Sequence, residues 1–305
     1  MKLKIASCQF PVGADIKKNE SHICRQIRQA AAEGADVVHF CEGALSGYAL
    51  SDFKSFAGFD WASLKASTIG VMEQAKASGI YLVLGSCHPL SGQLKPHNSV
   101  YVISSRGKIV TRYDKRFCAS DENGKNVELA HFTPGNHVTT FTVKGVKCGV
   151  LICHEYRYPE LYREMKKLNV EVVFHSFHAG NLTKARLKMM EKEVGPKNHK
   201  WNHGTNYPAI TMPAAIQTRA QSNYLWISAT NSSAKESTWA TFVVRPDGVI
   251  TERLRRNGAG LILSTIDTEL KFYDATKAWR KRAMNGQFHS GKLVQHPRSE
   301  NLKQL

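Results

Sequence analysis

Short apolar segments alternate with amphipathic segments along the chain, and this alternation is typical of proteins that mix strands and helices. Ile23 and Ile27 share one face of a helix that we predict from Asn19 to Glu33. Three more helices are predicted at Trp61–Ser78, Leu161–Leu168 and Ala209–Gln221. Strands are predicted at Lys2–Gln9, 36–42, Tyr81–Cys87, Ser99–Ile103, Lys108–Asp114, His137–Val143, Lys147–Ile152, Val170–Phe177, Tyr224–Thr230, Thr238–Arg245, Val249–Leu254 and Leu261–Asp267.

Mixed sheets covered by helices follow from this order, because tight turns such as Pro246–Gly248 join antiparallel strands and helices join parallel ones. Neither a linker nor a low-complexity segment divides the chain, so we expect one domain over residues 1–270 and a tail at 271–305. The loop at 116–136 is long enough to expect a function for it. Residues 178–207 are expected to be irregular, and the basic segment 182–200 within them is either a lid or a solvated excursion.

The composition is that of an ordinary folded protein, with 42% hydrophobic and 22% charged residues among 305. The formal net charge of +17 is large, and part of the excess lies at 184–200 and 271–305. Such a charge suits nucleic acid, an anionic membrane surface or an acidic substrate. The chain has no basic ladder interleaved with aromatic residues and no helix-turn-helix or zinc-finger spacing, so a nucleic-acid partner is not favoured.

The seven cysteines are scattered, without a C-x-x-C pair, which argues for free thiols in a reducing compartment and against a disulfide framework or a zinc ribbon. The N-terminal segment lacks the apolar stretch of a signal peptide, and no segment approaches the length of a membrane span. We therefore expect a cytoplasmic protein without a membrane anchor.

Cys153 is the first candidate for chemistry. It ends the apolar segment Cys148–Cys153 and comes just before a predicted helix. Backbone N–H groups and the positive end of a helix dipole favour the thiolate at such a turn, and the thiolate is the nucleophilic form. Buried cysteines at strand ends are also common as inert packing, so this position alone does not decide the function.

Two further charged residues stand at the ends of predicted strands. Glu42 follows an apolar strand and has Gly43 beside it, and Lys115 closes another strand. Taken alone, each residue has an explanation without chemistry: Glu42 as the start of a loop, and Lys115 as the solvated end of a strand. Together with Cys153 they supply a base, a cation and a nucleophile, which is the set that acyl transfer requires.

Four stretches in order give the chain a resemblance to the nitrilase superfamily of carbon–nitrogen hydrolases. They are the opening strand Lys4–Gln9, the glutamate motif Phe40–Tyr48, the lysine motif Tyr113–Phe117 and the cysteine motif Gly149–Glu160. The match extends from about residue 4 to about residue 298. The sequence departs from the family pattern at two places: Cys41 replaces the proline that usually precedes the glutamate, and Glu155 replaces a frequent aspartate after the cysteine.

The resemblance implies a four-layer α-β-β-α sandwich of two mixed sheets covered by helices. It also implies catalysis by Glu42, Lys115 and Cys153, with Glu128 as a second glutamate that reaches the site from the 116–136 loop. A homodimer or larger homo-oligomer is implied as well, with the tail after residue 283 contacting a partner subunit.

Further residues at strand ends are candidates for contact with a substrate. The backbone N–H of His154 is placed to bind a developing oxyanion beside the nucleophile. The other candidates are Tyr48, Phe177, His178 and Asn231. No metal or cofactor is expected, because the lysine and the backbone supply the positive charge. The pairs His199/His203 and His175/His178 have no suitably placed third ligand.

The predicted function is hydrolysis of a small amide or N-carbamoyl compound through a cysteine thioester, which releases ammonia or an amine and an acid. Nitrile hydrolysis and acyl transfer to another acceptor are alternatives at the same site. A basic nucleic-acid-binding protein with a vestigial site is the alternative from a different class, which the steep salt dependence of phosphate binding would distinguish.

Overall fold

Two six-stranded sheets form the centre of the fold in a computed structural model, which describes residues 1–303. The strand orders are β12-β1-β2-β3-β4-β5 and β11-β10-β9-β8-β7-β6. In each sheet three neighbouring strands are parallel, and the flanking strands pair antiparallel to them. The strands are β1 Lys2–Gln9, β2 Val37–His39, β3 Tyr81–His88, β4 His97–Ile103, β5 Ile109–Asp114, β6 Thr140–Val143, β7 Val146–Ile152, β8 Val172–Ser176, β9 Trp226–Thr230, β10 Phe242–Val244, β11 Ile250–Arg253 and β12 Gly260–Asp267.

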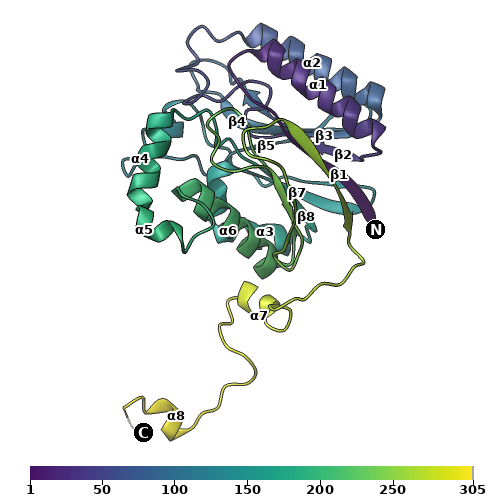
Figure 1. Ribbon diagram of the computed structural model, residues 1–305. Helices are drawn as coiled ribbons and strands as arrows, with labels where there is room; N and C mark the ends of the chain where they lie inside the picture. The colour runs from purple at the N-terminus through teal and green to yellow at the C-terminus, as the bar shows by residue number, and fades with distance from the viewer. Residues whose placement is uncertain (304–305) are drawn as a thin grey trace.

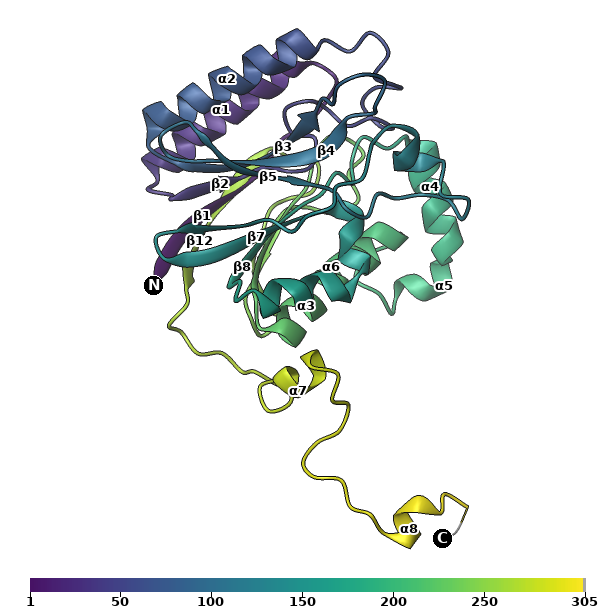
Figure 2. The same cartoon turned by 180° about the vertical axis from the view of Figure 1, so that it is seen from behind.

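Helices cover the outer face of each sheet. α1 (Ile16–Ala32) and α2 (Trp61–Ser78) lie together on the first sheet, and α3 (Pro159–Lys167) and α6 (Tyr207–Asn223) cover the second (Figure 1; Figure 2). The inner faces share one apolar core, in which Leu3 packs in the same cluster as Phe174. These four layers confirm the predicted α-β-β-α sandwich. No helix within residues 1–303 is both long enough and apolar enough to cross a membrane.

Capping side chains set the helix boundaries. The Asp15 carboxylate accepts the Lys18 N–H, so α1 begins before the predicted start at Asn19. α2 has the predicted bounds, because Asp60 caps its first turn and Gly79 ends it with a φ of 63°.

The prediction of irregular structure at 178–207 is wrong for part of that segment. α4 (Lys184–Val194) and α5 (Pro196–His199) form there, and the Thr183 hydroxyl caps α4 by accepting the Arg186 N–H. α4 consists of good helix formers but buries only Val194. It therefore lacks the amphipathic periodicity from which a helix is predicted.

The tail after β12 first follows the body of the fold and then leaves it. Phe272 packs edge-on against Trp226, and its N–H donates to the Tyr224 hydroxyl. Beyond α7 (Arg280–Met284) the chain extends away from the sheets to α8 (Pro297–Glu300), as Figures 1 and 2 show. Apolar side chains in that part, such as Phe288 at 88% exposure, have no apolar surface to cover.

A polar network crosses the interface between the sheets. The imidazole of His39 on β2 contacts Ser228 Oγ at 2.8 Å and Ser176 Oγ at 3.0 Å, both on the opposite sheet. Ser228 Oγ also lies 2.7 Å from Ser7 Oγ on β1. Burial lowers the pKa of His39 well below its usual value, so this ring is neutral in the folded protein. The network therefore fixes how the two sheets lie on each other.

The buried neutral histidine predicts a loss of stability in mild acid. An unfolded histidine binds a proton below pH about 6.5, whereas folded His39 does not, so stability falls as the pH drops below that value. For His39→Gln we expect the loss of unfolding free energy between pH 7 and pH 5 to be about 2 kcal/mol smaller than in the wild type, as measured by urea denaturation. The control is His137→Gln at an exposed site, which should leave the pH dependence unchanged. Equal losses in His39→Gln and the wild type would contradict the prediction.

Candidate active site

Side chains from both sheets meet near the carboxyl ends of the parallel strands. Glu42 follows β2 and Lys115 follows β5 in the first sheet, whereas Cys153 follows β7 in the second. The Glu42 N–H donates to the carbonyl of Phe177 at 3.3 Å, which ties the chain after β2 to the chain after β8. The turn next to Glu42 needs a glycine: Gly43 has a φ of 61°, and a Cβ there would lie 2.8 Å from a backbone oxygen.

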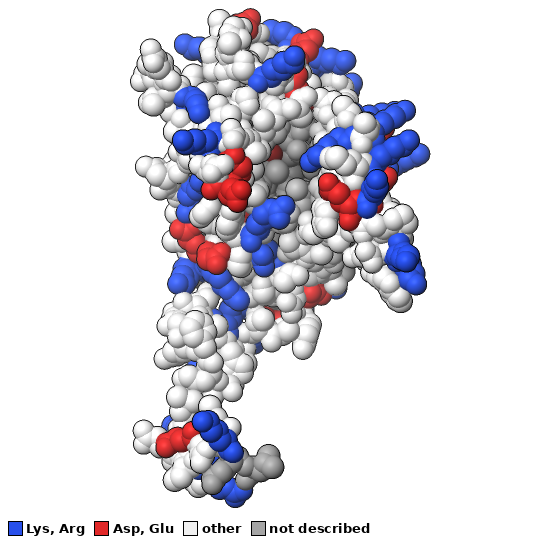
Figure 3. All heavy atoms as spheres, turned by 90° about the vertical axis from the view of Figure 1, so that its left-hand side faces the viewer, with Lys and Arg blue, Asp and Glu red and all other residues white. Residues whose placement is uncertain are grey.

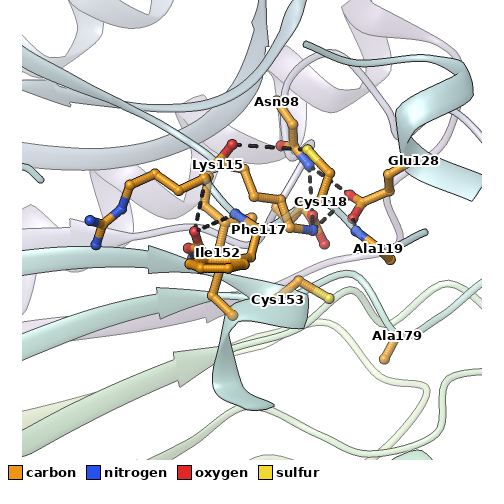
Figure 4. A network of polar contacts seen from close by, with 12 residues as sticks. Asn98, Lys115, Phe117, Cys118, Ala119, Glu128, Ile152, Cys153 and Ala179 are labelled. Carbon is orange, nitrogen blue, oxygen red and sulfur yellow. Dashed lines mark hydrogen bonds and ion pairs between the residues drawn. The ribbon is translucent and has the colours of Figure 1, made fainter. Parts of the chain in front are cut away.

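Lys115 is a buried ammonium between two buried carboxylates. Its Nζ lies 2.9 Å from Oε1 of Glu42 and 2.6 Å from Oε1 of Glu128, and its side chain is 1% exposed. Asn98 Nδ2 donates to the same two oxygens, at 2.7 and 3.3 Å. Figure 4 shows this network, with Cys153 on the segment below it. The structure thus brings together the three charged residues expected at the site.

The electrostatic balance keeps Lys115 and Glu128 charged. Burial lowers the pKa of Lys115, but Glu128 and Glu42 raise it by more, and the result is well above the usual value. Burial raises the pKa of Glu128, but Lys115, the Ala119 N–H and the Tyr48 hydroxyl lower it below the usual value. Oε2 of Glu42 is buried without a hydrogen-bond partner within residues 1–303, so this oxygen is free to accept a proton.

Cys153 begins a short 3₁₀ helix, η2 (Cys153–Arg157), with a φ of +40°, a left-handed conformation that is strained for a side chain with a Cβ. Burial and the Glu42 carboxylate raise the pKa of the Cys153 thiol well above its usual value, against the opposing effects of Lys115 and the His178 backbone N–H. This shift runs opposite to the preference for the thiolate expected from the turn. Burial, together with the Glu42 and Glu128 carboxylates, outweighs the Lys115 ammonium and favours the protonated thiol.

Glu155 holds the turn that carries Cys153 against the segment that carries Lys115. One of its carboxylate oxygens accepts the Ile152 N–H at 2.7 Å, and the other accepts the Arg116 N–H at 2.9 Å and the Tyr113 hydroxyl at 2.6 Å. The side chain is fully buried. The acid that departs from the usual family residue thus joins the two sheets at the site.

His175 on β8 supports the same turn from the other side. Its Nε2 lies 3.2 Å from the Cys153 carbonyl, and its Nδ1 lies 2.7 Å from the Tyr162 hydroxyl. Burial lowers the pKa of His175 to about 3, so the ring is neutral. The carbonyl can only accept, which assigns the proton to Nε2.

Two of the predicted substrate-contact residues lie beside the charged network. Tyr48 stacks on Phe132 and His178, with ring centroids 6.1 and 5.2 Å apart, and its hydroxyl helps to lower the pKa of Glu128. His154 is half-buried, and burial together with Lys115 lowers its pKa to about 4, so its ring is neutral at pH 7.

The side chains of Phe177, Asn231 and His178 are engaged in protein contacts. Phe177 is fully buried, with its ring centroid 4.2 Å from that of His175. Asn231 Oδ1 accepts the Ala179 N–H at 2.7 Å, and its Nδ2 donates to the Trp239 carbonyl, so it orders the loop after β8. His178 forms a buried ion pair with the Asp52 carboxylate.

Sequence reasoning missed Asn98, Asp52 and His175 as members of this region. Asn98 bridges Glu42 and Glu128, and Asp52 pairs with His178. Asn98 lies within a strand and Asp52 in a loop, so neither follows a strand end, the local signal that pointed to Glu42, Lys115 and Cys153.

Residues 1–303 contain no group of three or more His, Cys, Asp and Glu side chains arranged to hold a metal ion. His199 ends α5, and His203 lies beyond it, so the two are not on one helix. Figure 3 shows the face around α4 and α5, where basic side chains stand in small groups with acidic ones between them around a hollow.

A family model described as carbon–nitrogen hydrolase matches residues 4–273. The chain is 30% identical over 161 residues to omega-amidase NIT2 of Mus musculus and 27% identical over 183 residues to 2-oxoglutaramate amidase of Bacillus subtilis. These matches cover 52% and 58% of the chain, and it spans only 57% and 65% of the length of those relatives.

The fold is also that of a solved amidase. The structure of a variant of the amidase from Nesterenkonia sp. AN1 aligns with a TM-score of 0.69 at 18% identity, covering 87% of this chain and 90% of that one. That structure shows covalent addition of the acetamide moiety of fluoroacetamide at the active site cysteine of the Nesterenkonia enzyme.

The contacts of Glu155 predict that its two acceptor oxygens stabilise the fold. In Glu155→Gln the amide NH₂ replaces an acceptor and leaves a buried N–H group, such as that of Ile152, without a partner. We expect the unfolding free energy to fall by about 1–3 kcal/mol in urea denaturation. Tyr113→Phe is the matched control: it removes one donor from the same carboxylate, so we expect a smaller loss of about 1 kcal/mol. A Glu155→Gln variant as stable as the wild type would contradict this role.

Proposed function

Because the chain belongs to the carbon–nitrogen hydrolase family, we propose that it hydrolyses a small amide or N-carbamoyl compound through a thioester on Cys153. The observation that carries the proposal is the buried Lys115 ammonium. It forms ion pairs with both Glu42 and Glu128, and its charge lowers the pKa of the Cys153 thiol. A base, a cation and a nucleophile with these contacts are the parts required for acyl transfer.

The first half of the reaction forms the thioester. The free Oε2 of Glu42 takes the proton from the Cys153 thiol as the sulfur attacks the carbonyl carbon of the substrate. Charge develops on the carbonyl oxygen, where the Lys115 ammonium and the His154 backbone N–H stabilise it. Glu42 then gives the proton to the leaving nitrogen, the C–N bond breaks, and ammonia or an amine departs. General acid–base catalysis of this kind contributes about 10²–10⁴-fold.

The second half of the reaction uses the same groups. Glu42 takes a proton from water as the water oxygen attacks the thioester carbonyl. The C–S bond breaks, the proton returns to the sulfur, and the acid is released. Since the resting thiol is protonated, the base is needed in the first half as well as in the second.

Glu128 has an electrostatic role in this scheme. It accepts hydrogen bonds from Lys115, the Ala119 N–H and the Asn98 side-chain amide, so its charge is held in place. A fixed negative charge beside Lys115 keeps the ammonium protonated, because it raises the pKa of that group. Lys115 thereby remains a cation rather than a competing base.

An amide is the substrate class that the relatives favour over a nitrile. The mouse and Bacillus relatives are named as amidases, and the Nesterenkonia enzyme, also an amidase, shows covalent addition of the acetamide moiety of fluoroacetamide at its active site cysteine. We extend the class, and not the individual substrates, to this chain. All seven cysteines are free, which supports a location in the reducing cytoplasm.

A homo-oligomer in which the tail contacts a partner subunit is part of the proposal. Phe288, Leu293 and Val294 are each more than 70% exposed on a segment that leaves the body of the fold. Apolar side chains on an extended segment gain free energy when a second surface covers them.

Two single variants, Cys153→Ala and Glu42→Gln, test the function on a panel of substrates. The panel contains small amides, N-carbamoyl acids and nitriles, and released ammonia is measured. We expect no turnover of the preferred substrate by Cys153→Ala, because the nucleophile is gone. For Glu42→Gln we expect a loss of at least about 10²-fold in kcat, because the base is gone. Intact-protein mass spectrometry should detect an acyl group on Cys153 of the wild type.

The control for this test is Cys24→Ala, which removes a half-buried thiol on α1 and should keep full activity. Ammonia release that persists in Cys153→Ala would reject the thioester mechanism. A panel in which nitriles turn over and amides do not would reject the substrate class.

The tail is tested by a truncated chain that ends at Asn285. Removing the exposed apolar residues after α7 should shift the protein to a smaller species in size-exclusion chromatography with light scattering. The full-length chain with Phe288→Ser removes only one of these apolar side chains and should give a smaller shift in molar mass than the truncation. An unchanged molar mass after truncation would reject the contact between tail and partner.

A further inference from the structure

Asp52 and His178 form a buried ion pair beside the proposed active site. His178 Nε2 lies 3.0 Å from Asp52 Oδ2, and neither side chain is exposed to solvent. A buried pair of charges is costly to desolvate, so its presence next to a reactive thiol calls for a physical role.

The pair joins two segments, the loop after β2 and the loop between β8 and α4. The Asp52 carboxylate accepts the Tyr48 N–H at 2.9 Å from the loop after β2 and the Asn181 side-chain amide at 2.8 Å from the loop before α4. His178 itself follows β8 of the other sheet. Asp52 therefore sets the position of the His178 loop relative to the loop that carries Glu42.

From this position His178 contacts the site in two ways. Its backbone N–H lowers the pKa of the Cys153 thiol. Its ring stacks on that of Tyr48, with the centroids 5.2 Å apart, and the Tyr48 hydroxyl lowers the pKa of Glu128.

We propose that the Asp52–His178 ion pair is a positioning device for the nucleophile, which fixes the loop that brings the His178 backbone N–H toward the Cys153 thiol and keeps the Tyr48 ring stacked on His178. The inference rests on the proposed function only in taking Cys153 as the nucleophile. Asp52 and the His178 side chain act through other groups and do not contact the substrate.

The charges around the pair support an imidazolium at His178. Burial lowers the pKa of His178, but Asp52 and then Glu42 raise it by more, so the net value lies above the usual one. Burial raises the pKa of Asp52, but His178, the Tyr48 N–H and Asn181 lower it below the usual value. Each partner therefore favours the charged form of the other.

The experiment measures the reactivity of Cys153 itself, without a substrate. Iodoacetamide alkylation of Cys153 is followed by peptide mass spectrometry from pH 6 to 10 in the wild type, Asp52→Asn, His178→Gln and the double variant. For each single variant we expect alkylation about tenfold slower at neutral pH and an alkylation midpoint shifted upward by about one pH unit. A hydrogen bond to the thiolate is lost or weakened in each case.

The double variant tests whether the two residues act as one unit. Because both changes break the same pair, its alkylation rate should be no slower than that of either single variant. Asn181→Ala removes one ligand of Asp52 and should give an intermediate effect. Asp247→Asn breaks an ion pair with Arg245 in the turn before β11 and should behave as the wild type.

An alkylation change of less than twofold in both Asp52→Asn and His178→Gln, with cooperative unfolding retained, would overturn the inference. Additive effects in the double variant would overturn it as well. If either single variant fails to fold, the other and Asn181→Ala carry the test. The two proposals fail separately. Slower alkylation in the single variants would support the positioning role even if ammonia release persisted in Cys153→Ala. That persistence would reject only the thioester mechanism.

Discussion

A buried ammonium needs anions around it, and this requirement at Lys115 organises the region. The transfer of one charge from water to the interior costs several kcal/mol unless its hydrogen bonds are satisfied. Glu42 and Glu128 provide two of them at 2.9 and 2.6 Å, and Asn98 fills the remaining space between the carboxylates. The same arrangement leaves one oxygen of Glu42 unbonded, and this oxygen is the one that we propose as the base.

The geometry of the site depends on how the two sheets lie on each other. Glu42 and Lys115 come from the first sheet and Cys153 from the second, so a relative shift of the sheets would separate them. The contacts that resist such a shift are polar and buried: the His39 network between the strands and the Glu155 carboxylate at their ends. Buried polar groups are satisfied only in one register, which makes them more specific than apolar packing.

Much of this structure could be predicted from the sequence because strand ends carry a local signal. An apolar segment followed by Glu42 or Cys153 is visible without coordinates, and the strands and capped helices followed from periodicity. α4 was missed because it buries little. Asn98 and Asp52 were missed because their roles arise from contacts with residues far away in the chain. The preference of Cys153 for its protonated form was missed because it depends on the sum of several charges in one place.

The last strand of the first sheet has a consequence for how the protein is made. β12 pairs with β1 along their whole lengths, from Lys2 with Asp267 to Gln9 with Gly260. During synthesis the N-terminal strand therefore emerges from the ribosome long before its neighbour exists. Until then β1 presents an unpaired, largely apolar edge, the kind of surface that seeds association between nascent chains. The first sheet is therefore completed only after β12 has been synthesised, about 250 residues after β1.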